Sequence, residues 1–138
     1  MNRSEFQELA KIRLAEAKAL LDQKMFDGAY YLAGYAIECG LKSGIAKLTK
    51  QDDFPRDRKF IEKCYSHDFM DLLKASELLK EHELQTQNDA AFSANWAIVE
   101  AWTESSRYDR KGQADAEGLY NAITETTHGV MPWIEQHW

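Results

Sequence analysis

Apolar residues recur at helical spacing along most of this chain, and the most apolar stretch runs from about Phe26 to Leu48. Its i, i+3 and i+4 positions are apolar and comprise Phe26, Tyr30, Ala33, Ile37, Leu41, Gly44, Ile45 and Leu48. A glycine inside a helix costs about 1 kcal/mol against alanine, so the glycines here indicate close packing by a neighbouring helix. Because the apolar belt extends nearly all round, the pattern predicts a central helix covered on several sides.

Four other stretches carry the narrower apolar stripe of an amphipathic helix. They run from about Ser4 (the expected N-cap) to Asp22, Asp68 (with Ser66 or Asp68 as N-cap) to Glu83, Asn88 to Ser105, and Ala114 to His137. We expect Pro132 to interrupt the last one near His128. A charged connection from Thr49 to Ser66 holds at most a short helical turn. No stretch alternates with a period of two, so the sequence predicts an all-α bundle of about five helices in a single domain, residues 1–138.

Composition adds a soluble globular class to this prediction. Apolar residues make up 44% of the chain and charged residues 29%, which is ordinary for a folded soluble protein. No apolar run approaches the roughly 20 residues of a membrane span, and the charged N-terminal residues do not resemble a signal peptide. We therefore expect a cytoplasmic protein without membrane contact.

The cysteines and histidines give no pattern typical of a metal site. Cys39 lies in the apolar helical run, where we expect a small buried hydrophobe, and Cys64 has no CxxC partner. No two histidines have the i, i+4 spacing that would aim both at one metal. The chain also lacks a P-loop and a dinucleotide-binding glycine fingerprint. We therefore predict neither a metal nor a cofactor.

The formal net charge of −6 disfavours generic nucleic-acid coating, since that affinity comes from Lys and Arg on phosphates. The charge is uneven, however. Between residues 42 and 63 four acidic residues face seven basic ones, namely Lys42, Lys47, Lys50, Arg56, Arg58, Lys59 and Lys63. These are either solvated surface side chains or a cationic rim for a polyanion or an acidic partner.

The best candidate for a functional corner is the Ser105–Asp109 segment after the fourth predicted helix. Arg107 either caps helix carbonyls or, with Tyr108 and the Ser106 hydroxyl beside it, holds a phosphate or carboxylate. His67 is either a locally bonded residue near a helix start or a general acid/base.

Glu38 is a carboxylate in a mostly apolar helix and therefore needs a partner. Lys42 is available at i, i+4. The alternatives are an inward turn of Glu38 toward Arg107 or toward a symmetry-related copy.

Three segments together resemble the HEPN domain family. Residues 26–42 (FDGAYYLAGYAIECGLK) are similar to the family's long second helix. His67-Asp68-Phe69 resembles the start of the family's next helix, and Arg107-Tyr108-Asp109 resembles its "RYpd" segment. The resemblance covers nearly the whole chain. It implies an up-and-down helical bundle that forms a homodimer, pairs with a nucleotidyltransferase-family partner, and works in toxin–antitoxin or defence systems.

The chain departs from the family's ribonuclease branch, in which about four to six residues separate an arginine from a histidine. After Arg107 the relevant positions hold Gly112, Gln113 and Ala114. The resemblance therefore implies a binding module for a nucleotide, RNA or partner protein. The alternative is a divergent metal-independent ribonuclease using Arg107, Tyr108 and His67.

Overall fold

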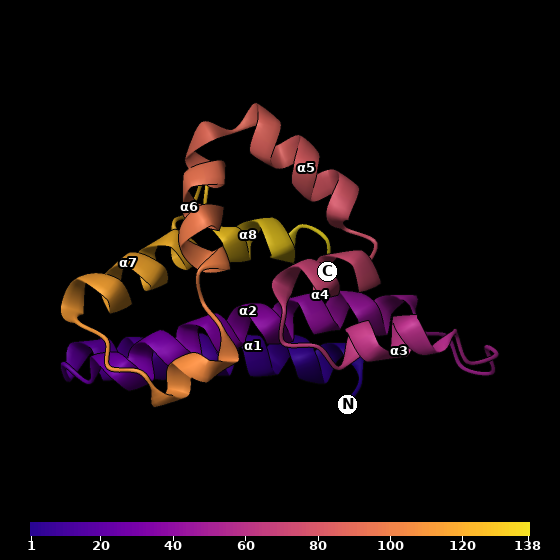
Figure 1. Ribbon diagram of the computed structural model, residues 1–138, viewed down its shortest axis with the longest axis horizontal. Helices are drawn as coiled ribbons and strands as arrows, with labels where there is room; N and C mark the ends of the chain where they lie inside the picture. The colour runs from indigo at the N-terminus through magenta and orange to yellow at the C-terminus, as the bar shows by residue number, and fades with distance from the viewer.

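In the computed structural model, which describes all of residues 1–138, every element of regular secondary structure is a helix (Figure 1). The elements are α1 (Arg3–Asp22), α2 (Phe26–Leu48), α3 (Arg58–Cys64), α4 (Phe69–Ala75), α5 (Leu79–Asn88), α6 (Ala90–Glu100), the 3₁₀ helix η1 (Glu104–Tyr108), α7 (Gln113–Thr124) and α8 (Val130–Glu135). The all-α prediction is confirmed. The chain forms eight α-helices where about five were expected.

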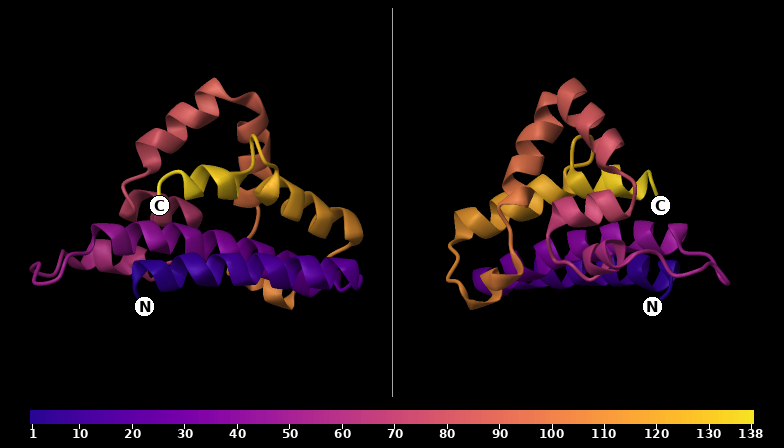
Figure 2. Two further views of the ribbon diagram at one scale, coloured as in Figure 1. Left: turned by 180° about the vertical axis from the view of Figure 1, so that it is seen from behind. Right: turned by 45° about the vertical axis from the view of Figure 1, so that its right-hand side comes forward.

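The centre of the molecule is α2, whose bounds agree with the sequence prediction. It lies antiparallel to α1 as a long hairpin (Figure 2) and also packs against α4, η1, α7 and α8. The small residues of α2, namely Ala29, Ala33, Ala36, Gly40 and Gly44, are all buried. A Cβ on Gly40 would come within 3.2 Å of the Ile134 side chain and one on Gly44 within 3.2 Å of Ser76. These residues therefore admit the close approach of α8 and of the end of α4.

Three of the predicted long helices are broken, each for a local reason. The third ends at Ser76, whose hydroxyl donates back to the Leu72 carbonyl, and Glu77 then takes a left-handed φ of 60°. The fourth begins at the N-cap Asp89 and stops at Glu100, so that Trp102 to Tyr108 turn away from α6. Side-chain and backbone turns thus end helices that the apolar spacing alone would have continued.

The fifth predicted helix is broken close to His128, as expected, but Pro132 lies inside α8 and does not end a helix. It occupies the first turn, where a backbone N–H has no partner within the helix, so proline is tolerated. The first part, α7, ends at Thr124, and Gly129 then stands at the N-cap of α8, where a Cβ would lie 2.2 Å from the Glu125 carbonyl oxygen.

The helix starts were partly predicted. Ser4 is not the cap of α1, because Asn2 accepts the Glu5 N–H and the Glu5 carboxylate accepts the Asn2 N–H. Of the two candidates for α4, Asp68 is the N-cap. A capping box anchors an N-terminus because it satisfies two free donors at once.

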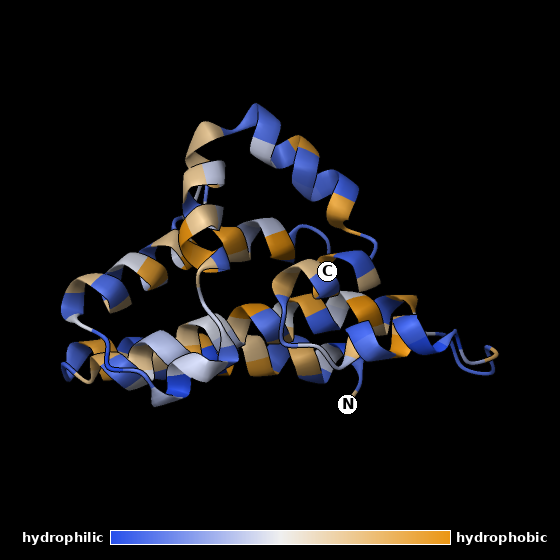
Figure 3. Cartoon of the chain, in the orientation of Figure 1, coloured by the Kyte–Doolittle hydropathy of each residue, from blue (hydrophilic) through white to orange (hydrophobic).

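The helices α5 and α6 rise from the α1–α2 hairpin as an arch over α8 (Figures 1 and 2). Most of α5 is hydrophilic (Figure 3). The His82 ring of α5 lies edge-on to Trp96 of α6, with ring centroids 4.2 Å apart, and to Trp133 of α8, with centroids 5.6 Å apart. The second contact joins the arch to α8. No helix combines the length and the apolar content that a membrane crossing requires.

Candidate functional site at the η1 elbow and the face of α2

One face of α2 receives the segment from Trp102 to Tyr108. The Trp102 ring rests on Gly34, where a Cβ would stand only 2.3 Å from three atoms of the indole. Trp102 is 3% exposed and also stacks on Phe69 with ring centroids 5.3 Å apart. The absence of a side chain at residue 34 therefore lets the segment from Trp102 to Tyr108, which we call the elbow, lie against α2.

Glu38 lies on the same helix and is 2% exposed. Lys42 Nζ donates to Glu38 Oε1 at 2.8 Å, so the predicted local pair is confirmed and Glu38 does not turn toward Arg107. His67 Nδ1 lies 3.0 Å from both oxygens of the same carboxylate. Two cationic or donor groups thus satisfy the buried carboxylate, as a buried charge requires.

His67 bridges two carboxylates, because its Nε2 lies 2.9 Å from Glu104 Oε2. An ionised carboxylate only accepts hydrogen bonds, so both contacts exist together when the imidazole carries two protons. Glu38 and Glu104 are distant in sequence from His67, and Asp68 provides the cap of α4. The prediction of a locally bonded His67 is therefore wrong: the ring joins α2 and η1 to the start of α4.

A hollow of about 460 Å³ opens beside His67. Its lining includes Asp68, Glu100 and Glu104 but no Lys or Arg. The local charge is negative, which opposes the approach of a phosphate. This side of His67 is thus poorly suited to a ribonuclease centre.

The Arg107–Tyr108 pair lies at the end of η1 and faces solvent. The Arg107 guanidinium lies over the Tyr108 ring, 5.0 Å from its centroid, and Tyr108 is 79% exposed. Hydrogen bonding to Tyr108, and more weakly to Tyr31, raises the pKa of Arg107. Arg107 makes no ion pair, so its charge is free to meet an anion.

Ser106, between these residues and the core, is 2% exposed, and its hydroxyl oxygen has no hydrogen-bond partner. The neighbouring Ser105 hydroxyl bonds to Thr103 at 2.8 Å. The elbow thus presents Arg107 and Tyr108 outward and keeps Ser106 inside.

An aromatic row continues from the elbow along α2. Tyr31 stacks on Trp102 with centroids 6.0 Å apart and on Tyr35 with centroids 6.2 Å apart. The Arg13 guanidinium of α1 lies 5.9 Å from the Tyr35 centroid. Both tyrosines are half-buried. Arg13 is paired with Glu16 at 2.6 Å, so Arg107 brings the unpaired positive charge to this face. We call Trp102, Tyr31 and Tyr35 the aromatic row.

The six residues singled out in the sequence fall into two groups. Glu38, Lys42 and His67 form one network, and Arg107, Tyr108 and Ser106 share η1; no hydrogen bond or ion pair joins Arg107 to His67. Sequence reasoning missed Glu104 and Tyr31. Tyr31 and Glu38 are seven residues apart on one helix, which was a usable signal for a shared face. The position of Glu104 depends on the turn after Trp102 and left no such signal.

The other reactive groups do not gather at this site. No cluster of three or more His, Cys, Asp or Glu side chains is arranged to hold a metal ion. Burial raises the pKa of the Cys39 thiol to about 11, which keeps it protonated and unreactive at neutral pH.

No protein-family model matches this chain, and no curated protein or solved structure matches it either.

Proposed function

We propose that this protein is a helical binding module of the HEPN type whose elbow and aromatic row bind a nucleotide. The observation that carries the proposal is the free, exposed Arg107 beside Tyr108 and the aromatic row. A guanidinium fork binds phosphate oxygens in pairs. Aromatic side chains stack on nucleobases with little preference for sequence. Together they match the two halves of a nucleotide.

Binding is better supported than RNA cleavage. His67 uses both ring nitrogens on carboxylates and has no hydrogen bond to Arg107. The hollow beside it is acidic. A general acid/base has to reach the proton that it transfers, and an acidic surface repels the phosphate that such a reaction needs.

The resemblance to HEPN domains also suggests the partners and the cellular system of this protein. On this proposal the protein forms a homodimer, works with a nucleotidyltransferase-like partner, and belongs to a toxin–antitoxin or defence system. The negative net charge of the chain supports a defined binding site over broad RNA coating.

Titration of the purified protein with ATP, followed by isothermal calorimetry, tests the binding site. We expect Arg107→Ala and Tyr108→Ala each to weaken binding by about five- to 150-fold, since a charge-assisted hydrogen bond or a base stack contributes about 1–3 kcal/mol. Tyr108→Phe should retain most of the affinity because the ring is kept.

Arg110→Ala is the matched control, because Arg110 is an exposed neighbour whose only ion-pair partner is Asp27 at 3.6 Å. Separate titrations with adenosine and with ribose 5-phosphate measure how much of the affinity for ATP comes from the base and how much from the phosphate. The proposal fails if neither ATP nor a short single-stranded RNA binds, or if the Arg107 and Arg110 variants lose affinity equally.

A further inference from the structure

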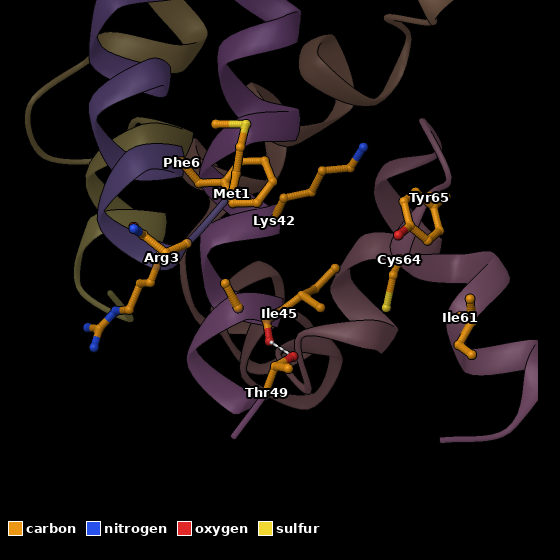
Figure 4. A pocket seen from close by; sticks show the side chains of 11 residues that line it. Met1, Arg3, Phe6, Lys42, Ile45, Thr49, Ile61, Cys64 and Tyr65 are labelled. Carbon is orange, nitrogen blue, oxygen red and sulfur yellow. Dashed lines mark hydrogen bonds between the residues drawn. The ribbon is translucent and has the colours of Figure 1, made fainter. Parts of the chain in front are cut away.

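A second surface lies at the other end of α2, between the start of α1, the last turns of α2, and α3. It contains a hollow of about 600 Å³. Figure 4 shows Met1 and Phe6 on one side, Ile61, Cys64 and Tyr65 on the other, and Ile45 between them. Tyr31 and Ile45 are 14 positions apart on α2, about 21 Å along the helix axis, so this surface is separate from the elbow.

A second hollow, of about 450 Å³, adjoins the first and shares Thr49 and Ile61 with it. Phe54, Pro55 and Phe60 are among the residues that line it. The two hollows form one apolar band along α3 and the loop before it. We call this band the α3 groove.

The helix α3 contributes no buried residue to the fold. On it and beside it, large apolar side chains face solvent: Ile61 is 41% exposed, Tyr65 78% and Phe54 92%. A seven-residue helix is marginal in water without packing, and a contiguous exposed apolar patch marks an interaction surface. The α3 groove therefore lacks the cover that its side chains would be expected to have.

The charges around the groove are positive although the whole chain carries −6. Arg3, Lys42, Lys50 and Arg56 line the two hollows, and Asp53 is their only acidic lining residue. Lys42 is paired with Glu38 and Arg56 with Glu77, whereas Arg3 and Lys50 make no ion pair. Lys59 and Lys63 of α3 make no ion pair. A positive rim around an apolar band favours an occupant with apolar anchors and acidic flanks.

We propose that the α3 groove is the docking site for an amphipathic, acidic helix of a partner protein. Such a helix would place apolar side chains at i, i+3/i+4 and i+7 into the groove, as in other helix-in-groove complexes. Its acidic flanks would face Arg3, Lys50 and the α3 lysines. A second copy of this chain fits this groove less well, because a symmetric contact would place the same positive rim, with Arg3 and Lys50, against itself.

The test uses two model peptides of about 18 residues, or five helical turns. Both carry Leu at the i, i+3/i+4 and i+7 positions; one has Glu and the other Lys at the flanking positions. Each is titrated into the ¹⁵N-labelled protein while amide chemical shifts are recorded. We expect saturable binding of the Glu peptide, shifts confined to α3, the end of α2 and the start of α1, and at least tenfold weaker binding of the Lys peptide.

Ile61→Glu and Leu84→Glu form a matched pair of variants. Both residues are aliphatic side chains on short helices, and Ile61 is 41% and Leu84 51% exposed. Neither change should therefore unfold the protein, and circular dichroism verifies this. Ile61→Glu should weaken the Glu peptide at least tenfold, while Leu84→Glu on α5 should leave its affinity within about twofold, a difference of about 1 kcal/mol or more.

Several outcomes would overturn the proposal. These are no binding of the Glu peptide, equal binding of the two peptides, or shifts centred on another surface. Anionic phosphatidylserine vesicles provide the last comparison. If they bind and the Glu peptide does not, and Ile61→Glu abolishes vesicle binding, the groove is a lipid-binding surface and the docking proposal is wrong.

Discussion

Trp102 can rest on α2 because residue 34 has no side chain, and this contact positions the whole elbow. A Cβ at residue 34 would stand 2.3 Å from the indole, and the buried ring has no room to move away. We expect Gly34→Ala to lower the free energy of unfolding by about 1–3 kcal/mol, the usual cost of overpacking. Urea unfolding followed by tryptophan fluorescence measures it.

Gly118→Ala is the control for this experiment. Gly118 lies within α7, and a Cβ there would meet nothing within 4 Å. Alanine should therefore stabilise the protein by about 0.5–1 kcal/mol, the helix-propensity difference. A loss of stability at residue 118 similar to that at residue 34 would contradict the assigned role of Gly34.

His82 is the second residue whose environment makes a clear prediction. It is 5% exposed, its Nε2 has no hydrogen-bond partner, and burial lowers its pKa below the ordinary 6.5. The unfolded chain therefore takes up a proton at His82 below about pH 6.5 while the folded chain does not. Stability from this residue is complete above that pH and declines as the pH falls toward the folded-state pKa.

We expect His82→Phe to remove this decline, since phenylalanine fits an aromatic environment of Phe92, Trp96 and Trp133 and does not titrate. The difference in unfolding free energy between wild type and variant should change by at most about 1.4 kcal/mol per pH unit below pH 6.5. Urea unfolding at several pH values measures it. Parallel curves for the two proteins would show that His82 does not couple folding to protonation.

At the scale of elements, the break between α4 and α5 rests on Glu77, which has a φ of 60°. This left-handed conformation costs a non-glycine residue about 1–2 kcal/mol. The Glu77 side chain offers only a 3.7 Å ion pair with Arg56 in return, and both partners are exposed, so that pair contributes little. We expect Glu77→Gly to stabilise the protein by about 0.5–1 kcal/mol in thermal or urea unfolding.

Glu83→Gly, inside α5, is the comparison variant. Glycine there should cost about 1 kcal/mol because the helix loses a favourable residue. The opposite signs of the two substitutions would identify residue 77 as a helix terminator. A destabilising Glu77→Gly would mean that the side chain of Glu77, and not its backbone, holds this junction.

At the scale of the whole molecule, Glu38 joins α2, the start of α4 and, through His67, η1. Glu38→Gln removes the negative charge opposite Lys42 and His67. We expect a loss of about 1–3 kcal/mol in unfolding free energy. This is below the full cost of breaking a buried pair, because His67 is half-exposed.

A double-mutant cycle with His67→Gln separates the pair from the individual side chains. A coupling energy above about 0.5 kcal/mol would show that the two residues act together. Additive effects would mean that the contact at 3.0 Å contributes nothing of its own.

The apolar periodicity of the chain determined its helical class, the bounds and central position of α2, and most of the buried residues, because these depend on spacing along a single helix. Phe69, Leu72, Phe92, Trp96 and Ile134, which lie at helical spacing in the other amphipathic stretches, are all buried. The pairing of Glu38 with Lys42 was likewise readable, since residues four apart on a helix are neighbours.

Only the tertiary structure decided where the long predicted helices break and which residues distant in sequence come into contact. Glu77 and Gly129 turn the chain through local backbone conformation and packing, which apolar spacing does not encode. The contact of His67 with Glu104, the seat of Trp102 on Gly34 and the uncovered α3 groove all join segments far apart in sequence. The Ser105–Asp109 segment could be singled out in advance, but its separation from His67 depends on how η1 crosses α2.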